Sequence, residues 1–164
     1  MTASINNYTV GKGIVSFKKT GATDYVDMGN CPSFEFTPSL DKLEHFSSRS
    51  GVKTKDKTIV VQKSGEVKLV LEEWNADNLA LAVLGTVTTV GGDSVIDIFG
   101  SDSVSGMLKF TGTNDVGPKY EWIFENVTFV PSAAISLISE EWGTLELTGD
   151  VTAVSGSFGT ITSL

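Results

Sequence analysis

Paired carboxylates are the side chains in this sequence that most directly suggest catalysis. They occur as Glu72-Glu73, as Glu140-Glu141, and as Asp24 with Asp27. Two carboxyl groups on either side of a glycosidic bond can act as acid and as base or nucleophile, so each pair is a candidate glycosidase site. Solvated strand faces and helix starts also collect acidic residues, and this is our preferred interpretation. A hydrolase remains our third hypothesis, and it requires a cleft around one of these pairs.

The sequence has few residues for cysteine or histidine chemistry. The chain has one cysteine, Cys31, and one histidine, His45, fourteen residues further on. A zinc site needs three or four ligands, and a disulfide within the chain needs a second cysteine. The sequence also contains no phosphate-binding glycine motif and no serine nucleophile elbow. We therefore expect no catalytic residues, no metal and no cofactor.

Charge is distributed unevenly along a chain whose net charge is −8. The stretch from residue 42 to residue 68 holds three acids and seven cations, which are Lys42, Arg49, Lys53, Lys55, Lys57, Lys63 and Lys68. Its balance is +4, which leaves −12 on the remainder, where there are five cations and 17 acids. A basic segment on an acidic body is suited to docking on the body of another copy. Such a head-to-tail contact builds rings or filaments rather than closed dimers.

The alternation of Lys53, Lys55 and Lys57 within this segment has three interpretations. On a strand these lysines share one face, where they could contact another subunit, form a solvated edge or bind nucleic acid. The segment lacks interleaved aromatic residues that would stack on bases, and the acidic net charge disfavours holding phosphate. We favour the contact between subunits.

Strand patterns dominate the rest of the chain. In residues 145–154, Leu145, Leu147 and Val151 alternate with polar residues, which predicts a half-buried strand. Residues 58–62 and 66–72 are two further β-type runs, and Lys63-Ser64-Gly65 between them predicts a hairpin. Other predicted strands cover residues 8–17, 34–37, 95–99, 107–111 and 119–130.

Two segments depart from the strand pattern. Residues 75–84 are rich in alanine and leucine, which predicts one short helix, with Asn75 or Asp77 as its cap and Gly85 as a left-handed end. Residues 39–57 are polar and long for a connection in a compact domain, which is typical of a functional loop or arm.

The predicted fold class follows from these elements. It is mainly β: an antiparallel sandwich or barrel with one short helix, in a single domain over residues 1–164 that carries an inter-subunit arm. The sequence begins without a basic and apolar leader, and no apolar run reaches the length of a bilayer. We expect synthesis in the cytoplasm and no membrane insertion.

The chain resembles the tail tube proteins of long-tailed bacteriophages over most of its length. The resemblance is carried by the strand-then-helix segment Gly65-Glu-Val-Lys-Leu-Val-Leu-Glu-Glu-Trp-Asn-Ala-Asp-Asn-Leu-Ala-Leu-Ala-Val-Leu-Gly85. Residues 8–18 with Tyr25-Val-Asp-Met-Gly-Asn30 resemble the first strands of these proteins, and Phe34-Glu-Phe-Thr-Pro38 precedes a similar polar arm. Glu146-Leu-Thr-Gly-Asp150 resembles the closing strand.

The resemblance implies a structural protein of the virion tail that is assembled in the bacterial host cytoplasm. Six copies would form a ring, and stacked rings would form a hollow conduit through which viral DNA passes without specific binding. The implied partners are further copies of the chain and the tape measure, tail terminator and distal tail or baseplate proteins. The arm would reach a neighbouring ring, so the expected stacking residues are Lys42, His45, Phe46, Arg49, Lys53, Lys55 and Lys57.

A binding module is the alternative from a different functional class. An immunoglobulin-like or carbohydrate-binding domain of an adhesin or receptor-binding protein would use the tryptophans, Trp74, Trp122 and Trp142, as a sugar platform. Tryptophans more often anchor cores and interfaces, which is the interpretation we prefer. A stable monomer with exposed aromatic residues near Trp122 or Trp142 would favour the binding module.

Overall fold

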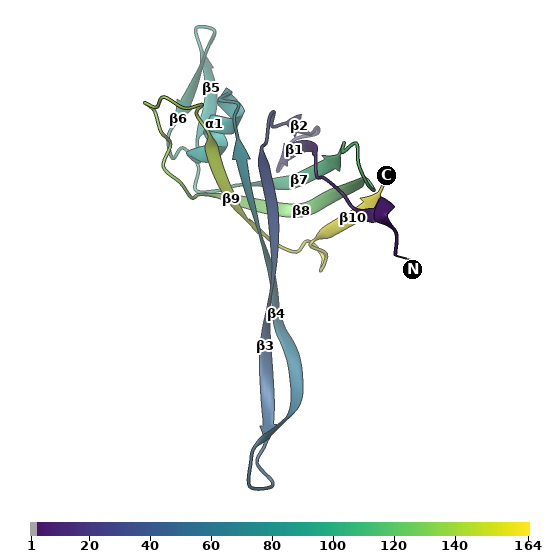
Figure 1. Ribbon diagram of the computed structural model, residues 1–164. Coiled ribbons are helices and arrows are strands. Elements are labelled where there is room, and N and C mark those ends of the chain that lie inside the picture. Colours follow the sequence, from purple (N-terminus) through teal and green to yellow (C-terminus); the bar gives the residue numbers. More distant parts are fainter. Residues whose placement is uncertain (1–2) are drawn as a thin grey trace.

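Alternating apolar residues build a curved antiparallel sheet from which one long hairpin projects (Figure 1). The computed structural model describes residues 3–164. The helical elements are a short 3-10 turn, Ile5–Asn7, and one α-helix, α1, Ala76–Ala82. The strands are β1 Gly13–Lys19, β2 Val26–Asp27, β3 Ser33–Ser47, β4 Thr54–Leu71, β5 Thr86–Val90, β6 Asp93–Asp97, β7 Val104–Gly112, β8 Tyr120–Pro131, β9 Leu145–Val151 and β10 Gly159–Ser163.

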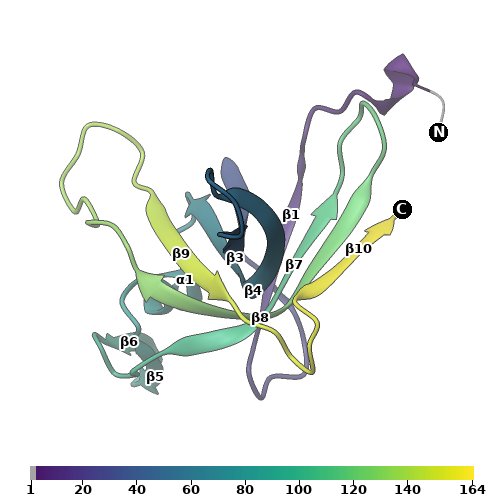
Figure 2. The ribbon, with the colours of Figure 1, turned by 90° about the horizontal axis from the view of Figure 1, so that it is seen from below.

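The main sheet has the strand order β2-β1-β7-β8-β9-β4-β3, and each strand is antiparallel to its neighbours. Along one of its edges, the long strand β8 pairs with two different strands. Residues 120–124 pair with β10, and residues 127–131 pair with β9. The sheet curves around this strand (Figure 2). Its terminal strands, β2 and β3, do not pair with each other, so the fold is a mainly-β, sandwich-like sheet and not the closed barrel of the alternative expectation.

The core lies on the concave face of this curved sheet. In β9 the predicted alternation is confirmed, because Leu145, Leu147 and Val151 are buried. Buried and exposed residues also alternate at the end of β4. In the same core, the rings of Phe17 and Phe129 meet edge to face with centroids 5.1 Å apart. The core therefore covers the C-terminal part of β4, which precedes the helix, and leaves the N-terminal part of this strand exposed.

Helix α1 is where the sequence predicted it. The Asn75 side chain caps the helix by accepting from the Asn78 backbone N–H at 2.8 Å. The left-handed residue at the other end is Leu84, with φ of 49°, and not Gly85 as expected. The Gly85 N–H donates to the Ala80 carbonyl at 2.6 Å, which completes a Schellman-type end. Glycine is needed at position 85 because a Cβ there would lie 2.6 Å from Ile96 Cγ2.

Three strand assignments from the sequence were wrong or incomplete. No hairpin forms at residues 63–65, because Thr54–Leu71 is one continuous strand; Gly65 is required there by the Phe36 ring, which lies 2.6 Å from its ideal Cβ position. The first strand begins at Gly13 rather than at residue 8. Strands β5 and β10 were not predicted, although the turn at Gly91-Gly92 between β5 and β6 was, and both glycines have positive φ.

Among the described residues, no helix is long and apolar enough to cross a membrane.

Candidate functional site

The outer parts of β3 and β4 leave the body as a two-stranded hairpin (Figure 1). We call residues 39–64 the arm. Its strands pair from Ser39↔Ser64 to Ser47↔Thr54, with irregularities after Asp41 and after His45. Nine paired residues at about 3.3 Å each give the arm a reach of roughly 30 Å. The segment predicted as a polar loop or arm over residues 39–57 is therefore the larger part of a β-hairpin.

Both faces of the arm carry apolar side chains that the body does not cover. Directly opposed residues on paired strands share a face, so Leu43 and Ile59 lie on one face of the arm, and Lys42 and Val60 lie on the other. The exposed apolar residues of the arm are Leu40, Leu43, Phe46, Val52, Ile59, Val60 and Val61. An isolated two-stranded hairpin is marginally stable in water, and contiguous exposed apolar surface marks an interaction site. Both faces of the arm thus carry exposed apolar surface.

Part of the predicted cationic set is neutralised inside the arm. Lys55 forms an ion pair with Glu44, and His45 Nδ1 lies 2.5 Å from Asp56 Oδ1. The other five lysines and arginines of the arm form no ion pair within residues 3–164, and these are Lys42, Arg49, Lys53, Lys57 and Lys63. These pairs were not predicted, because they depend on the pairing of residues 54–62 with residues 39–47, which spacing in the sequence does not reveal.

The three alternating lysines do not share one face. Lys53 lies before the start of β4, in the connection at the tip of the arm. Lys55 is opposite Phe46, whereas Lys57 is opposite His45, because the strand gains a residue at Asp56. Since Phe46 and His45 are neighbours on one strand, their partners lie on opposite faces. The positive charge of the arm is therefore distributed around it, not collected in a stripe.

The outer edge of β3 is a second feature suited to assembly. Within the described residues β3 pairs only with β4, so its other edge presents unpaired backbone N–H and C=O groups. Such an edge is a template for pairing with a further strand.

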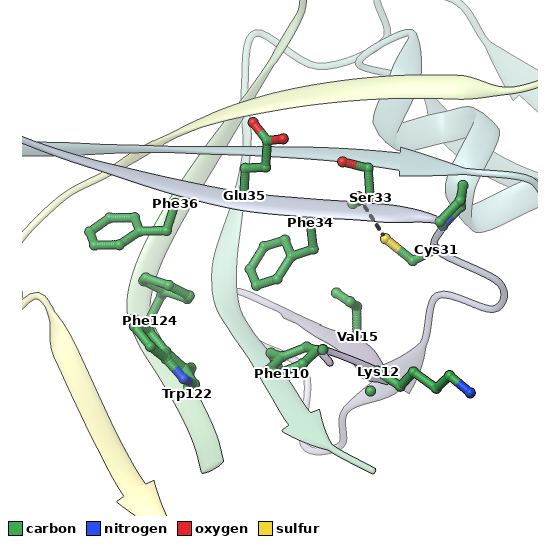
Figure 3. Close-up of a pocket in the computed structure, with 13 residues that line it drawn as sticks. Lys12, Val15, Cys31, Ser33, Phe34, Glu35, Phe36, Phe110, Trp122 and Phe124 are labelled. Atoms are coloured by element: carbon green, nitrogen blue, oxygen red, sulfur yellow. Dashed lines mark hydrogen bonds between the residues drawn. The ribbon is translucent and has the colours of Figure 1, made fainter. Parts of the chain in front are cut away.

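One hollow of the body lies where the sheet does not close (Figure 3). It measures about 500 Å³ and lies between β3 and the strands β1, β7 and β8. Aromatic rings form its floor: Phe34 stacks on Phe110 with centroids 5.7 Å apart, and Phe36 meets Trp122 at 6.4 Å. Trp122 thus belongs to a partly buried aromatic cluster, which agrees with the preferred core interpretation.

The thiol of Cys31 lies at the rim of this hollow (Figure 3). Its Sγ donates to the Ser33 carbonyl at 3.1 Å. Burial raises the pKa of the thiol, and hydrogen bonds with the backbone of Val70 and Ser33 only partly oppose this effect. A thiol in this setting is protonated at neutral pH and is a weak nucleophile.

Two of the three carboxylate pairs make local hydrogen bonds in the described residues. Asn30 contacts both members of the first pair, since its side chain donates to Glu72 and its backbone N–H donates to Glu73 Oε1 at 3.1 Å. Asp27 accepts from the Gly29 N–H at 2.9 Å. Within residues 3–164 no cluster of three or more cysteine, histidine or acidic side chains is arranged to hold a metal ion. These contacts order the connections that precede β3 and follow β4.

Comparison with known families gives a match over the first part of the chain. A family model described as "Protein of unknown function UCP028589" matches residues 8–103, which is more than half of the chain. The matched region contains β1 to β6, helix α1 and the whole arm, and it ends immediately before β7. No curated protein matches the chain in sequence.

Proposed function

We propose that this chain, which belongs to the UCP028589 family, is the structural subunit of a phage tail tube. Copies assemble into rings, which the sequence resemblance predicts to be hexameric, and the rings stack into a hollow conduit for viral DNA. The tape measure, tail terminator and distal tail or baseplate proteins are the further partners that the resemblance implies.

One observation supports this proposal above the others: a hairpin projects about 30 Å from the body with uncovered apolar side chains on both faces. A hairpin of this kind is stabilised when another surface covers it. The residues outside positions 42–68 carry a net charge of −12, so the body of a second copy complements the unpaired cations of the arm. Copies joined arm to body repeat in one direction, which generates a stacked polymer rather than a closed pair.

Two further features are consistent with a conduit. The open edge of β3 is available for strand pairing between copies, which would remove that edge from water. The acidic excess repels phosphate, so DNA would pass without being held.

Charge reversal in the arm tests the proposal. Lys42→Glu, Lys53→Glu and Lys57→Glu together target cations without an ion-pair partner in the described chain, and they should abolish polymer formation in negative-stain micrographs. The matched control is Lys12→Glu, Lys19→Glu and Lys119→Glu, which makes the same change in net charge outside the arm and should leave assembly intact.

Circular dichroism of both triple variants should match that of the parent chain. Normal polymers from the arm variant would refute the role of the arm. A parent chain that stays monomeric at every concentration would instead favour the binding-module hypothesis.

A further inference from the structure

A second hollow lies on the body at the end away from the arm. It is formed where the chain leaves β4, at Glu72 and Trp74, and by the connection between β8 and β9, which we call the 132–144 loop. The hollow measures about 340 Å³. Figure 2 shows this loop projecting from the body, and Figure 1 places it at the opposite end from the tip of the arm.

The 132–144 loop exposes large apolar side chains. Ile138 is 96% exposed, Trp142 is 93% exposed and Leu137 is 81% exposed. The wall of the hollow is nevertheless well built, because Gly143 packs so closely on the Trp74 ring that a Cβ would lie 2.8 Å from Cζ2. Two tryptophans and a leucine thus line a concave surface that no described residue covers.

Acidic side chains lie among these apolar groups. Glu72 and Glu141 both line the hollow. Within residues 3–164 neither forms an ion pair, although Glu72 accepts a hydrogen bond from the Asn30 side chain. The lining of the hollow therefore combines apolar side chains and two serines with two carboxylates.

The tip of the arm has the complementary pattern. Val52 is 84% exposed, and it lies between Arg49 and Lys53, which form no ion pair in the described chain. One apolar side chain flanked by two cations complements a hollow whose lining holds two tryptophans, a leucine and two carboxylates. Because the tip of the arm and the 132–144 loop lie at opposite ends of the molecule (Figure 1), a single copy does not bring the tip and the hollow together.

We propose that the tip of the arm of one copy docks into this hollow on the next copy. Val52 packs between Trp74 and Trp142, Lys53 approaches Glu141, and Arg49 approaches Glu72. This inference rests on the proposed function and names the contact through which the arm joins successive copies. The contact is heterologous, so each added copy presents a free hollow or a free tip for the next one.

The larger hollow beside Phe34 and Trp122 is a poorer acceptor for the tip. It contains the cation Lys12, and Glu35 is its single carboxylate. Charge complementarity therefore selects the hollow at the 132–144 loop.

A charge swap tests the contact. Lys53→Glu and Glu141→Lys should each raise the protein concentration needed for assembly by about tenfold or more, as expected for a close pair of charges at an interface. The double variant should return to within about threefold of the parent chain, since the pair is restored with reversed sign. Glu140→Lys is the matched control, because Glu140 neighbours Glu141 but does not line the hollow, and it should assemble like the parent chain.

Cross-linking provides a second measurement that does not depend on charge. In a Cys31→Ser background, Val52→Cys with Leu137→Cys should give a ladder of disulfide-linked oligomers on non-reducing gels. Val52→Cys with Val116→Cys, which is also exposed but lies outside the hollow, should give no ladder.

The outcomes separate the two proposals. Polymers that form normally with Glu141→Lys, or that give no Val52–Leu137 ladder, would overturn this docking site and leave the proposed function standing. A Cys31→Ser chain that never polymerises, like its parent, would remove the proposed function itself. Binding of a sugar in the hollow with no effect of Trp142→Ala on assembly would also overturn the docking site.

Discussion

The pKa of the Cys31 thiol depends on how the folded chain buries it. The thiol is half-buried beside the first residues of β3 and donates to the Ser33 carbonyl. Because burial raises its pKa, the reaction of the folded chain with a thiol reagent should reach its half-maximal rate at a higher pH than for an unhindered cysteine. Equal midpoints for the folded and the urea-unfolded chain would contradict this prediction.

The sign of the linked effect on stability follows from the raised pKa. Folding favours the neutral thiol, so this contribution to the free energy of unfolding is complete below the ordinary pKa of cysteine. It is lost as the pH rises through the raised value. The free energy of unfolding, measured with urea, should therefore decline as the pH rises through that value, and Cys31→Ser should remove this decline. A decline of the same size in the Cys31→Ser chain would show that other groups cause it.

Individual residues also show where sequence reasoning succeeded and where it failed. Asn75 was predicted as one of two possible helix caps, because capping depends on neighbours in sequence, and it is the cap. Gly65 was interpreted as a turn, because glycine alone does not reveal that a ring from another strand must pass close to it. The pairing of Lys55 with Glu44 likewise depends on strand register.

At the scale of elements, the arm is separable from the core. The strands enter it at the paired residues Pro38 and Gly65, and no core residue lies between them. Replacing residues 39–64 with a two-residue Asn-Gly turn should therefore leave the body folded, since such a turn suits two antiparallel strands. We expect an almost unchanged urea midpoint and complete loss of polymers.

The same excision separates a docking element from a folding element. Circular dichroism and tryptophan fluorescence would check the body, because all three tryptophans lie outside the arm. A body that unfolds on losing the arm would contradict the division between core and arm that the burial pattern indicates.

Sequence patterns predicted the elements whose signals are local. Strand β9 and helix α1 follow from spacing and capping alone. The charge asymmetry also selected most of the arm before its shape was known. The continuity of β4 and the acceptor hollow were not predictable in this way, since both depend on segments far apart in sequence, such as Trp74 and the 132–144 loop.

At the scale of the whole molecule, its two ends carry different surfaces. The tip of the arm lies at one end of the molecule, and the 132–144 loop lies at the other (Figure 1). The tip is cationic and apolar, and the loop forms part of the acidic, aromatic hollow. A copy with unlike ends has an unsatisfied surface at each end of any finite stack. We interpret the exposed apolar residues at both ends as the two halves of one repeated contact.

Negative-stain electron microscopy of the concentrated chain, at about 0.1 M and at about 1 M salt, tests the central claim most directly. Charge attraction extends over about 10 Å at the lower salt and about 3 Å at the higher, so the polymers should be longer at the lower salt. We predict stacked rings that form hollow rods. Single separate copies at every concentration and salt would contradict the account.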